Sequence, residues 1–507
     1  MNQEKIIKRN RLFFPLGTIG RDMIYQLFTN FIYTYVLFTR SLTDAQLGAI
    51  AGIMIAARVF DAINDPLMGN IIDRTRTKWG KFKPWLAIGI LSTSLVVYLA
   101  FNSIFEGWSF IIFFGVVYFF FSITFTMHDI SYWGMIPSLG SDAGERDILT
   151  SRANLCAGLG STLAGMLVPM FTIGASAIGG NARTAYGIIA LIFCLLAPLF
   201  LGITIFGVKE KRDYEKAPAP PVSFKKIIRT ISGNDQLRWI TLIILLQQIG
   251  NGLIMGGMGT TYIYFEFGYA GGLYSIFSTI GVLATAFLMI FYPLISRKVR
   301  RKSLMRQMIL VAAAGYGLML LAGLLIPAGN MIKFWIITLA YMIANLGQYS
   351  FYLVIMISIL NTVEYNELRT GQRDDAIIAS VRPFMTKLGS ALTIAITTVS
   401  YILFRVTNFT NQISALEQQA NLNQITDEVK LEKIGEVLSE VSKTQTLGLL
   451  LVMSTISFLF MLAAHSCTRS ITGWMRMNTG GFAWNWKKRT QGPELSEEKD
   501  GVFRQER

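Results

Sequence analysis

Two carboxylates lie four residues apart in a stretch that is otherwise apolar enough to cross a lipid bilayer. In AARVFDAINDPLMGNIID, residues 56–73, Asp61 and Asp65 share one helix face about 5–6 Å apart. If both are ionised, they repel each other by roughly 3 kcal/mol at an effective dielectric constant of about 20. Protonation, a basic partner or a bound cation must offset this cost, and Arg58, one turn earlier, can neutralise only one of them.

A second apolar stretch carries further oxygen ligands. The sequence SITFTMHDISYWGMIP places Thr126, Asp129 and Trp133 on another predicted span. Asp65 and Asp129 each lie about twenty residues beyond a helix entry point on the same side of the membrane, so we expect them at a similar depth. Carboxylate, amide and hydroxyl oxygens are the ligands that a hard cation prefers. The sequence therefore predicts a site for Na⁺, Li⁺ or H⁺.

The predicted cation ligands come from these two helices. They are Asp61, Asn64, Asp65, Thr126 and Asp129, of which the first four form the candidate Na⁺ site. An alternative stays open from the residues alone: the acids could form ion pairs with Arg58 and Arg152 that only hold helices together. Carboxylate and guanidinium groups in a polar cavity would also suit a polyhydroxylated ligand, because each can bind paired hydroxyls bidentately.

The rest of the chain supplies many more membrane-spanning segments. Of the 507 residues, 52% are hydrophobic and 15% are charged, whereas a soluble chain usually has about 25% charged residues. We predict about twelve helices with the roughly 20 apolar residues that one crossing requires. They lie near residues 11–38, 44–72, 83–103, 108–137, 150–173, 184–208, 236–267, 272–295, 304–327, 332–360, 376–404 and 445–468. The predicted fold class is an all-α polytopic membrane protein.

Basic residues follow a pattern along the predicted loops. Lys and Arg are frequent in alternate loops, such as DRTRTKWGKFK and SRKVRRKSLMR, and rare in the loops between them. The positive-inside rule then places both termini in the cytoplasm. The net charge of +15 is thereby attributed to topology and to contact with the lipid bilayer, not to nucleic acid. With two histidines and no cysteines at ligand spacing, the sequence indicates neither an enzyme nor a resident cofactor.

The chain divides into two similar parts. A polar, proline-containing connector at residues 209–235 separates six predicted spans in residues 1–208 from six in residues 236–468. Residues 405–444 alternate apolar and charged positions at helical spacing, which predicts one or two surface helices on the exterior side. Residues 469–507 are expected to form a cytoplasmic tail. Such duplication is common in secondary transporters, which bind their substrate between the two halves.

The motifs quoted above also support a family resemblance. The sequence DAINDPLMG followed by DRTRTKWGKFKPW resembles the glycoside-pentoside-hexuronide:cation symporter family of the major facilitator superfamily. The likeness runs from GRDM near residue 20, through MHDISYWGMIP, to NTVEYNE and MTKLGSAL, and omits only the 405–444 segment and the tail. It implies twelve helices in two six-helix bundles, in a bacterial plasma membrane, that import a sugar together with a cation by alternating access.

The resemblance also implies roles for individual residues. Its cation site corresponds to the four candidate Na⁺ ligands, and its sugar site corresponds to Asp22, Asp129, Trp133, Arg152, Tyr352 and Lys387. Asp22 could instead pair with its neighbour Arg21, and Lys387 could form a salt bridge with one of the acids.

This sequence departs from the pattern of a family member at Tyr352, which replaces a tryptophan, and at Asn361 and Pro383. The departures leave the particular sugar open.

The expected mechanism is coupled transport of Na⁺ or H⁺ with a glycoside, a pentoside or a related sugar. The cation would neutralise Asp61 and Asp65, draw their helix toward the helix of Asp129 and complete the sugar site. A different class of substrate on the same scaffold, such as a non-sugar amphiphile, is the alternative. It would need an apolar groove, and the charges predicted for the cavity argue against one.

Overall fold

The computed structural model describes residues 3–140, 142–210, 224–255, 257–298, 301–370 and 375–468. Regular structure in these ranges is helical, apart from one isolated β-bridge between Thr77 and Gly80. The predicted tail at 469–507 lies outside the described residues. The all-α fold class predicted from the sequence is confirmed.

The helices of residues 3–207 form what we call the N-terminal half. They are α1 (Gln3–Thr39), α2 (Asp44–Arg74), α3 (Lys83–Phe101), α4 (Gly107–Gly134), α5 (Ile136–Leu139), α6 (Ala143–Thr172) and α7 (Ala182–Gly207), with a 3₁₀ turn at Gly174–Ser176.

The C-terminal half follows a short helix, α8 (Phe224–Gly233). It contains α9 (Asp235–Met255), α10 (Gly257–Phe267), α11 (Gly271–Lys298), α12 (Arg301–Leu325), α13 (Met331–Thr370), α14 (Asp375–Leu403), α17 (Lys443–Leu451), a π-helical turn at Val452–Ile456 and α18 (Ser457–Cys467). The sequence predicted one or two helices between residues 405 and 444, and the structure has two, α15 (Val406–Asn421) and α16 (Asp427–Ser439). We call this pair the cap.

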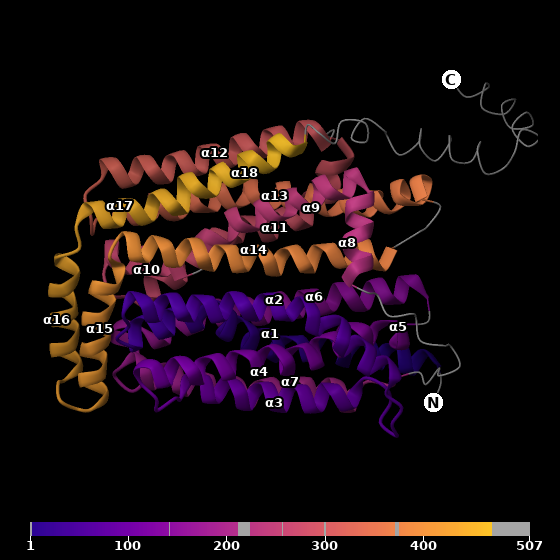
Figure 1. The fold of residues 1–507 in the computed structure, drawn as a ribbon, viewed down its shortest axis with the longest axis horizontal. Helices are drawn as coiled ribbons and strands as arrows, with labels where there is room; N and C mark the ends of the chain where they lie inside the picture. Colours follow the sequence, from indigo (N-terminus) through magenta and orange to yellow (C-terminus); the bar gives the residue numbers. More distant parts are fainter. Residues whose placement is uncertain are drawn as a thin grey trace, which may run out of the picture.

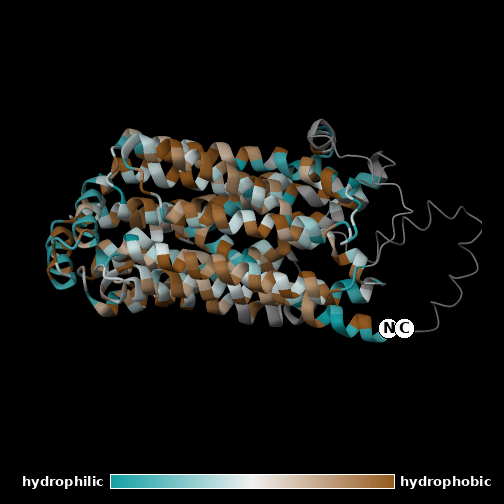
Figure 2. Cartoon of the chain, turned by 90° about the horizontal axis from the view of Figure 1, so that it is seen from below, coloured by the Kyte–Doolittle hydropathy of each residue, from teal (hydrophilic) through white to brown (hydrophobic). Residues whose placement is uncertain are grey.

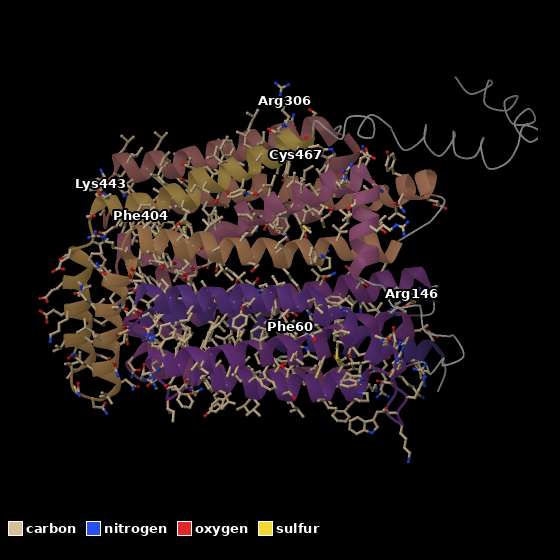
Figure 3. The ribbon with its side chains drawn as sticks, in the orientation of Figure 1. Phe60, Arg146, Arg306, Phe404, Lys443 and Cys467 are labelled. Atoms are coloured by element: carbon tan, nitrogen blue, oxygen red, sulfur yellow. The ribbon has the colours of Figure 1, made fainter. Side chains whose placement is uncertain are left out.

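The long helices are apolar enough to lie in a membrane. In the described ranges nine helices meet the length and hydropathy needed for a crossing, and α2 makes ten if its two bent segments form one span. Figure 2 shows hydrophobic residues along the body of the bundle and hydrophilic residues toward its ends. In Figure 3 the labelled Lys443 and Arg146 lie toward opposite ends, with Phe60 between them. The chain is a multi-pass membrane protein.

The bend in α2 has a local cause. Its segments Asp44–Asp61 and Ile63–Arg74 meet at 41°. Pro66 lies inside the helix four residues after the bend, and a proline both lacks the N–H that would bond to the carbonyl of residue 62 and crowds that carbonyl. The kink therefore separates Asp61 from Asp65, and the two acids project from differently inclined segments.

The two halves lie side by side, with the cap across one end (Figure 1). At this cap end they are joined by hydrogen bonds from Ser275 Oγ to Met166 O (2.7 Å) and between Tyr33 Oη and Thr398 Oγ1 (2.8 Å). The cap adds a bond from Asn411 Nδ2 to Leu42 O (2.8 Å). Between described residues, all hydrogen bonds that cross the halves lie in this region, except one ion pair deeper in the bundle. The structure is therefore closed at the cap end.

Candidate functional site

The four candidate Na⁺ ligands lie together where α2 packs against α4. The Ser122 hydroxyl donates to Asp61, and Thr126 Oγ1 donates to Asp65 Oδ1 (3.1 Å). Asn64 Nδ2 lies 3.5 Å from the backbone oxygen of Ser122. Because Asp61 and Asp65 repeat at i, i+4 on α2, the hydroxyls of Ser122 and Thr126 meet them at the same spacing on α4. The site offers carboxylate, amide and hydroxyl oxygens within one contact.

Each of the two α2 acids has a basic partner. Arg58 NH1 lies 3.6 Å from Asp61 Oδ2, one turn away on the same helix. Lys387 Nζ of α14 forms an ion pair with Asp65 Oδ2, and both side chains are partly exposed. The cost of two anions in an apolar segment is thus offset by one cation from each half of the protein. Among the residues that the structure describes, the Asp65–Lys387 pair is the ion pair that joins the halves away from the cap end, where α2 packs against α14.

A second cluster of charges surrounds Arg21 on α1. Its guanidinium donates to Asp22 Oδ2 (2.8 and 3.0 Å) and to Asp129 Oδ1 of α4 (2.9 Å). It also lies over the rings of Tyr132 and Trp133, at 5.0 and 5.2 Å from the ring centroids. Asp22, Asp129 and Trp133 are therefore gathered as a group, around a buried arginine that received no such role from the sequence.

The direct ion-pair partner of Asp129 is Arg21 of α1, although Asp65 of α2 is near enough for its charge to act on Asp129. We expected Asp61, Asp65 and Asp129 to serve one cation, but in the described part of the chain no three acids, histidines or cysteines are placed to hold one ion. The physical reason is the guanidinium, which neutralises Asp129 from α1. Asp129 thus belongs to the cluster around Arg21.

Arg152 and Tyr352 lie in other surroundings. Arg152 is exposed and donates to the backbone oxygen of Arg11 (3.3 Å), which precedes Asp22 on α1 by three turns, about 16 Å. The Tyr352 hydroxyl accepts a bond from Arg382 Nε (3.0 Å). The side chain of Asn361 is outside the described residues.

Sequence reasoning missed Ser122, Arg21 as the organiser of its cluster, and Arg382. A signal existed for Ser122, since it precedes Thr126 by four residues on the same helix face. Arg21 and Arg382 are charged residues inside predicted spans, and such residues are generally functional or paired.

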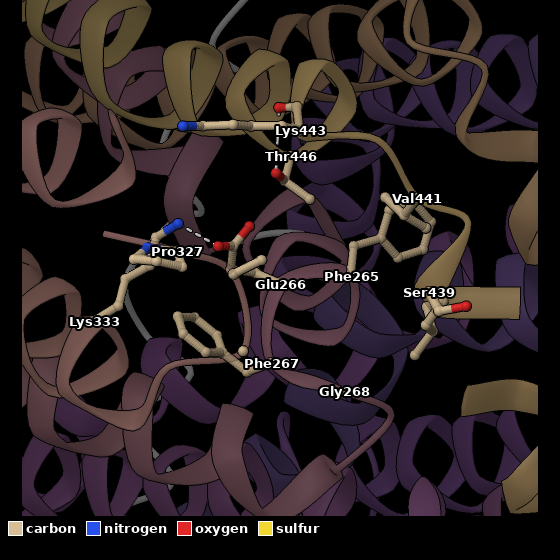
Figure 4. A pocket seen from close by; sticks show the side chains of 13 residues that line it. Phe265, Glu266, Phe267, Gly268, Pro327, Lys333, Ser439, Val441, Lys443 and Thr446 are labelled. Atoms are coloured by element: carbon tan, nitrogen blue, oxygen red, sulfur yellow. Dashed lines mark hydrogen bonds and ion pairs between the residues drawn. The ribbon is translucent and has the colours of Figure 1, made fainter. Parts of the chain in front are cut away.

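A cavity lies at the cap end, and none of the residues predicted for the site lines it. It has a volume of about 470 Å³ and is bordered by α10, α13 and the segment that leaves α16. At its wall, Lys333 and Glu266 form a buried ion pair (Figure 4). Each of these two buried charges is neutralised by the other, and the ion pair links α10 to α13.

The fold and the site define a class of protein: a helical membrane transporter with charged clusters inside its N-terminal half, one of which is linked to the C-terminal half by the Asp65–Lys387 ion pair. Residues 13–423 match the family described as MFS/sugar transport protein. The chain belongs to this family, as the resemblance to the glycoside-pentoside-hexuronide:cation symporters predicted. The family comprises transporters, not enzymes, and its members are located in the cell membrane.

Relatives of known name agree with this assignment. The chain is 28% identical to the lactose permease of Lactobacillus helveticus over 408 residues, 77% of this chain and 61% of the relative. It is 27% identical to the raffinose carrier protein of Pediococcus pentosaceus over 398 residues, 75% of this chain and 60% of the relative. It therefore spans about three fifths of these proteins. The uncharacterized symporter YnaJ of Bacillus subtilis is 25% identical over 393 residues, 77% of this chain and 82% of that one.

Solved structures support the fold alone. A bacterial homologue of the lysosomal transporter Spinster, in an inward-facing and unoccupied conformation, superimposes with a TM-score of 0.59 at 13% identity, covering 94% of this chain and 98% of that one. The nucleoside transporter NupG gives 0.59 at 14% identity, covering 91% and 99%. The helical arrangement is that of these transporters.

Proposed function

We propose that this protein is a symporter that imports a glycoside, a pentoside or a related sugar together with Na⁺ or H⁺ across the cell membrane. The observation that carries the proposal is the ion pair between Asp65 of α2 and Lys387 of α14. It joins the two halves inside the membrane at an acid that has the oxygen neighbours of a cation site. A contact of this kind can couple cation binding to movement of the halves.

The proposed architecture is that of two six-helix bundles. Twelve spans would lie in residues 1–208 and 236–468, joined by the connector at 209–235, and both termini would be cytoplasmic. The cap would then lie outside the cell, and closure at the cap end would correspond to an inward-facing state. Alternating access would require the contacts at that end to break.

The proposed cation site is the contact of α2 with α4. Asp61, Asn64, Asp65 and Thr126 would supply the oxygen ligands for Na⁺ or Li⁺, and the same carboxylates could take a proton. In the inward-facing state Lys387 Nζ supplies the positive charge next to Asp65. We infer that the transported cation and the lysine ammonium compete for this carboxylate.

The proposed sugar site is built around the cluster of Arg21. Asp22 and Asp129 would accept hydrogen bonds from sugar hydroxyls, and Trp133 would offer an aromatic face. Lys387, once released from Asp65, would be free to donate to a sugar oxygen. Tyr352 and Arg152 lie outside this cluster in the described state and would have to approach the sugar during the transport cycle. The full proposed set of substrate-binding residues is Asp22, Asp129, Trp133, Arg152, Tyr352 and Lys387.

Coupling follows from linkage between the two sites. If the cation frees Lys387 for the sugar, cation binding raises sugar affinity, and sugar must raise cation affinity by the same factor. The membrane potential adds about 2.3 kcal/mol per charge per 100 mV to inward movement. A non-sugar amphiphile is the less favoured substrate, because the relatives are named as lactose and raffinose carriers and the clusters are charged.

Uptake measurements test the proposal. Proteoliposomes would be given radiolabelled glycosides under a Na⁺ gradient, a pH gradient or neither. We expect one cation to drive accumulation, and Asp65→Cys to abolish it. Asp73→Cys, at the end of the same helix, serves as the matched control and should retain accumulation. Gradient-driven accumulation in Asp65→Cys at the wild-type level would contradict the model.

A further inference from the structure

A second cavity lies at the seam between the halves and has no charged side chain in its lining. It has a volume of about 250 Å³ and is bordered by α1, α6 and α11. Its polar lining includes Gln26, Asn30, Ser161, Thr162, Ser278 and Thr279. We call it the seam cavity. Because α11 belongs to the other half, an occupant would contact both halves at once.

The position of the seam cavity relates it to the charged cluster. Gln26 and Asn30 follow Asp22 on α1 by one and two helical turns, which places them about 6–12 Å farther toward the cap end. On the cap side, the bond from Ser275 Oγ to Met166 O (2.7 Å) joins α11 to α6. The seam cavity therefore lies between the proposed sugar site and the closed end of the protein.

Several hydrogen-bond donors and acceptors that line the seam cavity are available to a ligand. Asn30 Nδ2 donates to Gln26 Oε1 (2.7 Å), which leaves the Gln26 amide nitrogen and the Asn30 carbonyl oxygen. Within the described ranges, the hydroxyls of Ser161, Thr162 and Thr279 have no protein partner. An apolar occupant would leave these groups unsatisfied at a cost, and an ion would find no opposite charge. A neutral ligand rich in hydroxyls satisfies them.

The size of the seam cavity limits its occupant. Pockets that enclose a whole drug-sized ligand measure about 300–1,000 Å³, so a space of about 250 Å³ suits a single sugar ring. We propose that the seam cavity binds the second ring of a disaccharide whose first ring lies at Asp22 and Asp129. This inference rests on the proposed function and assigns to that site a preference for glycosides with two rings.

The cavity also has a consequence for transport. A ring held by α1 and α6 on one side and by α11 on the other adds contacts between the halves beside the Ser275–Met166 bond. These contacts exist only while the cap end is closed. A disaccharide should therefore favour closure more than a monosaccharide does, by its differential affinity for the closed state.

A steric variant tests the site directly. A Cβ at Gly165 would meet only Gln26 Nε2, at 3.7 Å, so Gly165→Leu projects into the seam cavity without a clash at its own backbone. We expect the variant to lose uptake of lactose and of maltose and to retain uptake of methyl β-galactoside and methyl α-glucoside, whichever pair the wild type transports. Gly158→Leu on the same helix points into open space and is the matched control.

A polar variant gives a second readout. Thr279→Val keeps the shape of the side chain and removes one hydroxyl, which should raise the disaccharide KM about tenfold and change the methyl glycoside KM less than twofold. Thr285→Val, whose hydroxyl bonds within α11 to Val282 O (2.6 Å), is the control. Equal effects on both sugars in both test variants would overturn the subsite and leave the symporter standing. If the wild type shows no cation-dependent uptake of any glycoside, the proposed function itself fails.

Discussion

Lys387 is the residue whose position most directly connects the two proposed sites. Its ammonium forms an ion pair with Asp65, beside the hydroxyl of Thr126. A positive charge at this place opposes the binding of a second cation by Coulomb repulsion. The same charge also makes Asp65 tolerable inside the membrane when no cation is bound. The lysine would therefore set both the cation affinity and its dependence on sugar.

Replacing Lys387 should separate these two effects. In Lys387→Gln the competing ammonium is gone, so we expect the dissociation constant for Na⁺ to fall roughly tenfold or more, while sugar accumulation is lost. Calorimetric titration of the purified protein with Na⁺ would measure the change in cation affinity. If the wild type binds no Na⁺, the measurement is instead the uptake of protons by the protein on acidification. Lys81→Gln, which breaks the ion pair with Asp73 near the end of α2, is the control. Weaker cation binding in Lys387→Gln would contradict competition.

Single side chains were partly predictable from the sequence. Asp61, Asn64, Asp65 and Thr126 were chosen for their types and spacing, and the structure brings them into one contact. Arg21 was not predicted to organise Asp22 and Asp129, because helical spacing describes which residues share a face and not how far a long guanidinium reaches to a neighbouring helix. The partner of Asp65 was uncertain for a similar reason, since Lys387 lies 322 positions later in the chain.

At the scale of elements, the kink in α2 controls how its two acids are presented. Pro66 removes one backbone hydrogen bond at the point where the helix bends by 41°. In Pro66→Ala the bond can form and alanine is an excellent helix former. We expect α2 to straighten, the thermal midpoint to stay the same or rise, and cation-driven accumulation to fall at least about tenfold because Asp61 and Asp65 leave their hydroxyl partners.

Two measurements distinguish this effect from simple misfolding. Circular dichroism would follow the unfolding of Pro66→Ala, and uptake assays would follow transport. Pro198→Ala, a proline inside α7 and away from both charged clusters, is the control. Full transport by Pro66→Ala would mean that the kink has no part in shaping the site.

The cap contains a buried acid that should respond to pH. Glu417 of α15 accepts a hydrogen bond from the Ala182 backbone N–H (2.6 Å), and Lys430 of α16 lies 3.7 Å away. Burial raises the pKa of Glu417 above its ordinary value, although Lys430 opposes this effect, and Tyr269 and Asp427 also face the acid. The docked cap therefore holds the proton of Glu417 more tightly than the unfolded chain does.

The sign of the pH dependence follows from this shift. The contribution of Glu417 to stability is fully present below the ordinary pKa of a glutamate and is lost as the pH rises through the raised value. We expect the thermal midpoint of the wild type to fall across this range, and the dependence to flatten in Glu417→Gln, which resembles the protonated form. Glu440→Gln, at the C-terminal end of α16, is the control. Parallel pH curves for wild type and Glu417→Gln would refute the assignment.

Elements were the most predictable level of this protein. The periodic pattern of residues 405–444 predicted surface helices, and both α15 and α16 are present. The sequence could not show where they dock, because docking depends on loops of the N-terminal half that are far away in the chain. The bend in α2 was readable in Pro66, but the apolar pattern alone suggested one straight span.

For the molecule as a whole, the contacts at the cap end matter most. The halves meet there through side chains and backbone, and the cap of the C-terminal half bonds to the turn between α1 and α2 of the other half. The sequence predicted two halves and a central site, yet it contained no information about which end is closed. Closure is a property of one state in an ensemble, which the sequence must encode together with the alternative state.

A reversible cross-link would test whether the cap must leave the N-terminal half during transport. Ser41 Oγ lies 3.0 Å from Ser414 Oγ, so cysteines at both positions would place their sulfurs close enough to bond. In a background without Cys156, Cys194 and Cys467, we expect oxidation of Ser41→Cys/Ser414→Cys to stop uptake and a reducing agent to restore it. Each single variant should transport normally under both conditions. A disulfide that persists through the transport cycle prevents any separation of α15 from the turn at Ser41. If the oxidised double variant still accumulates sugar, the cap therefore moves together with the N-terminal half, and the closed end must open at another place.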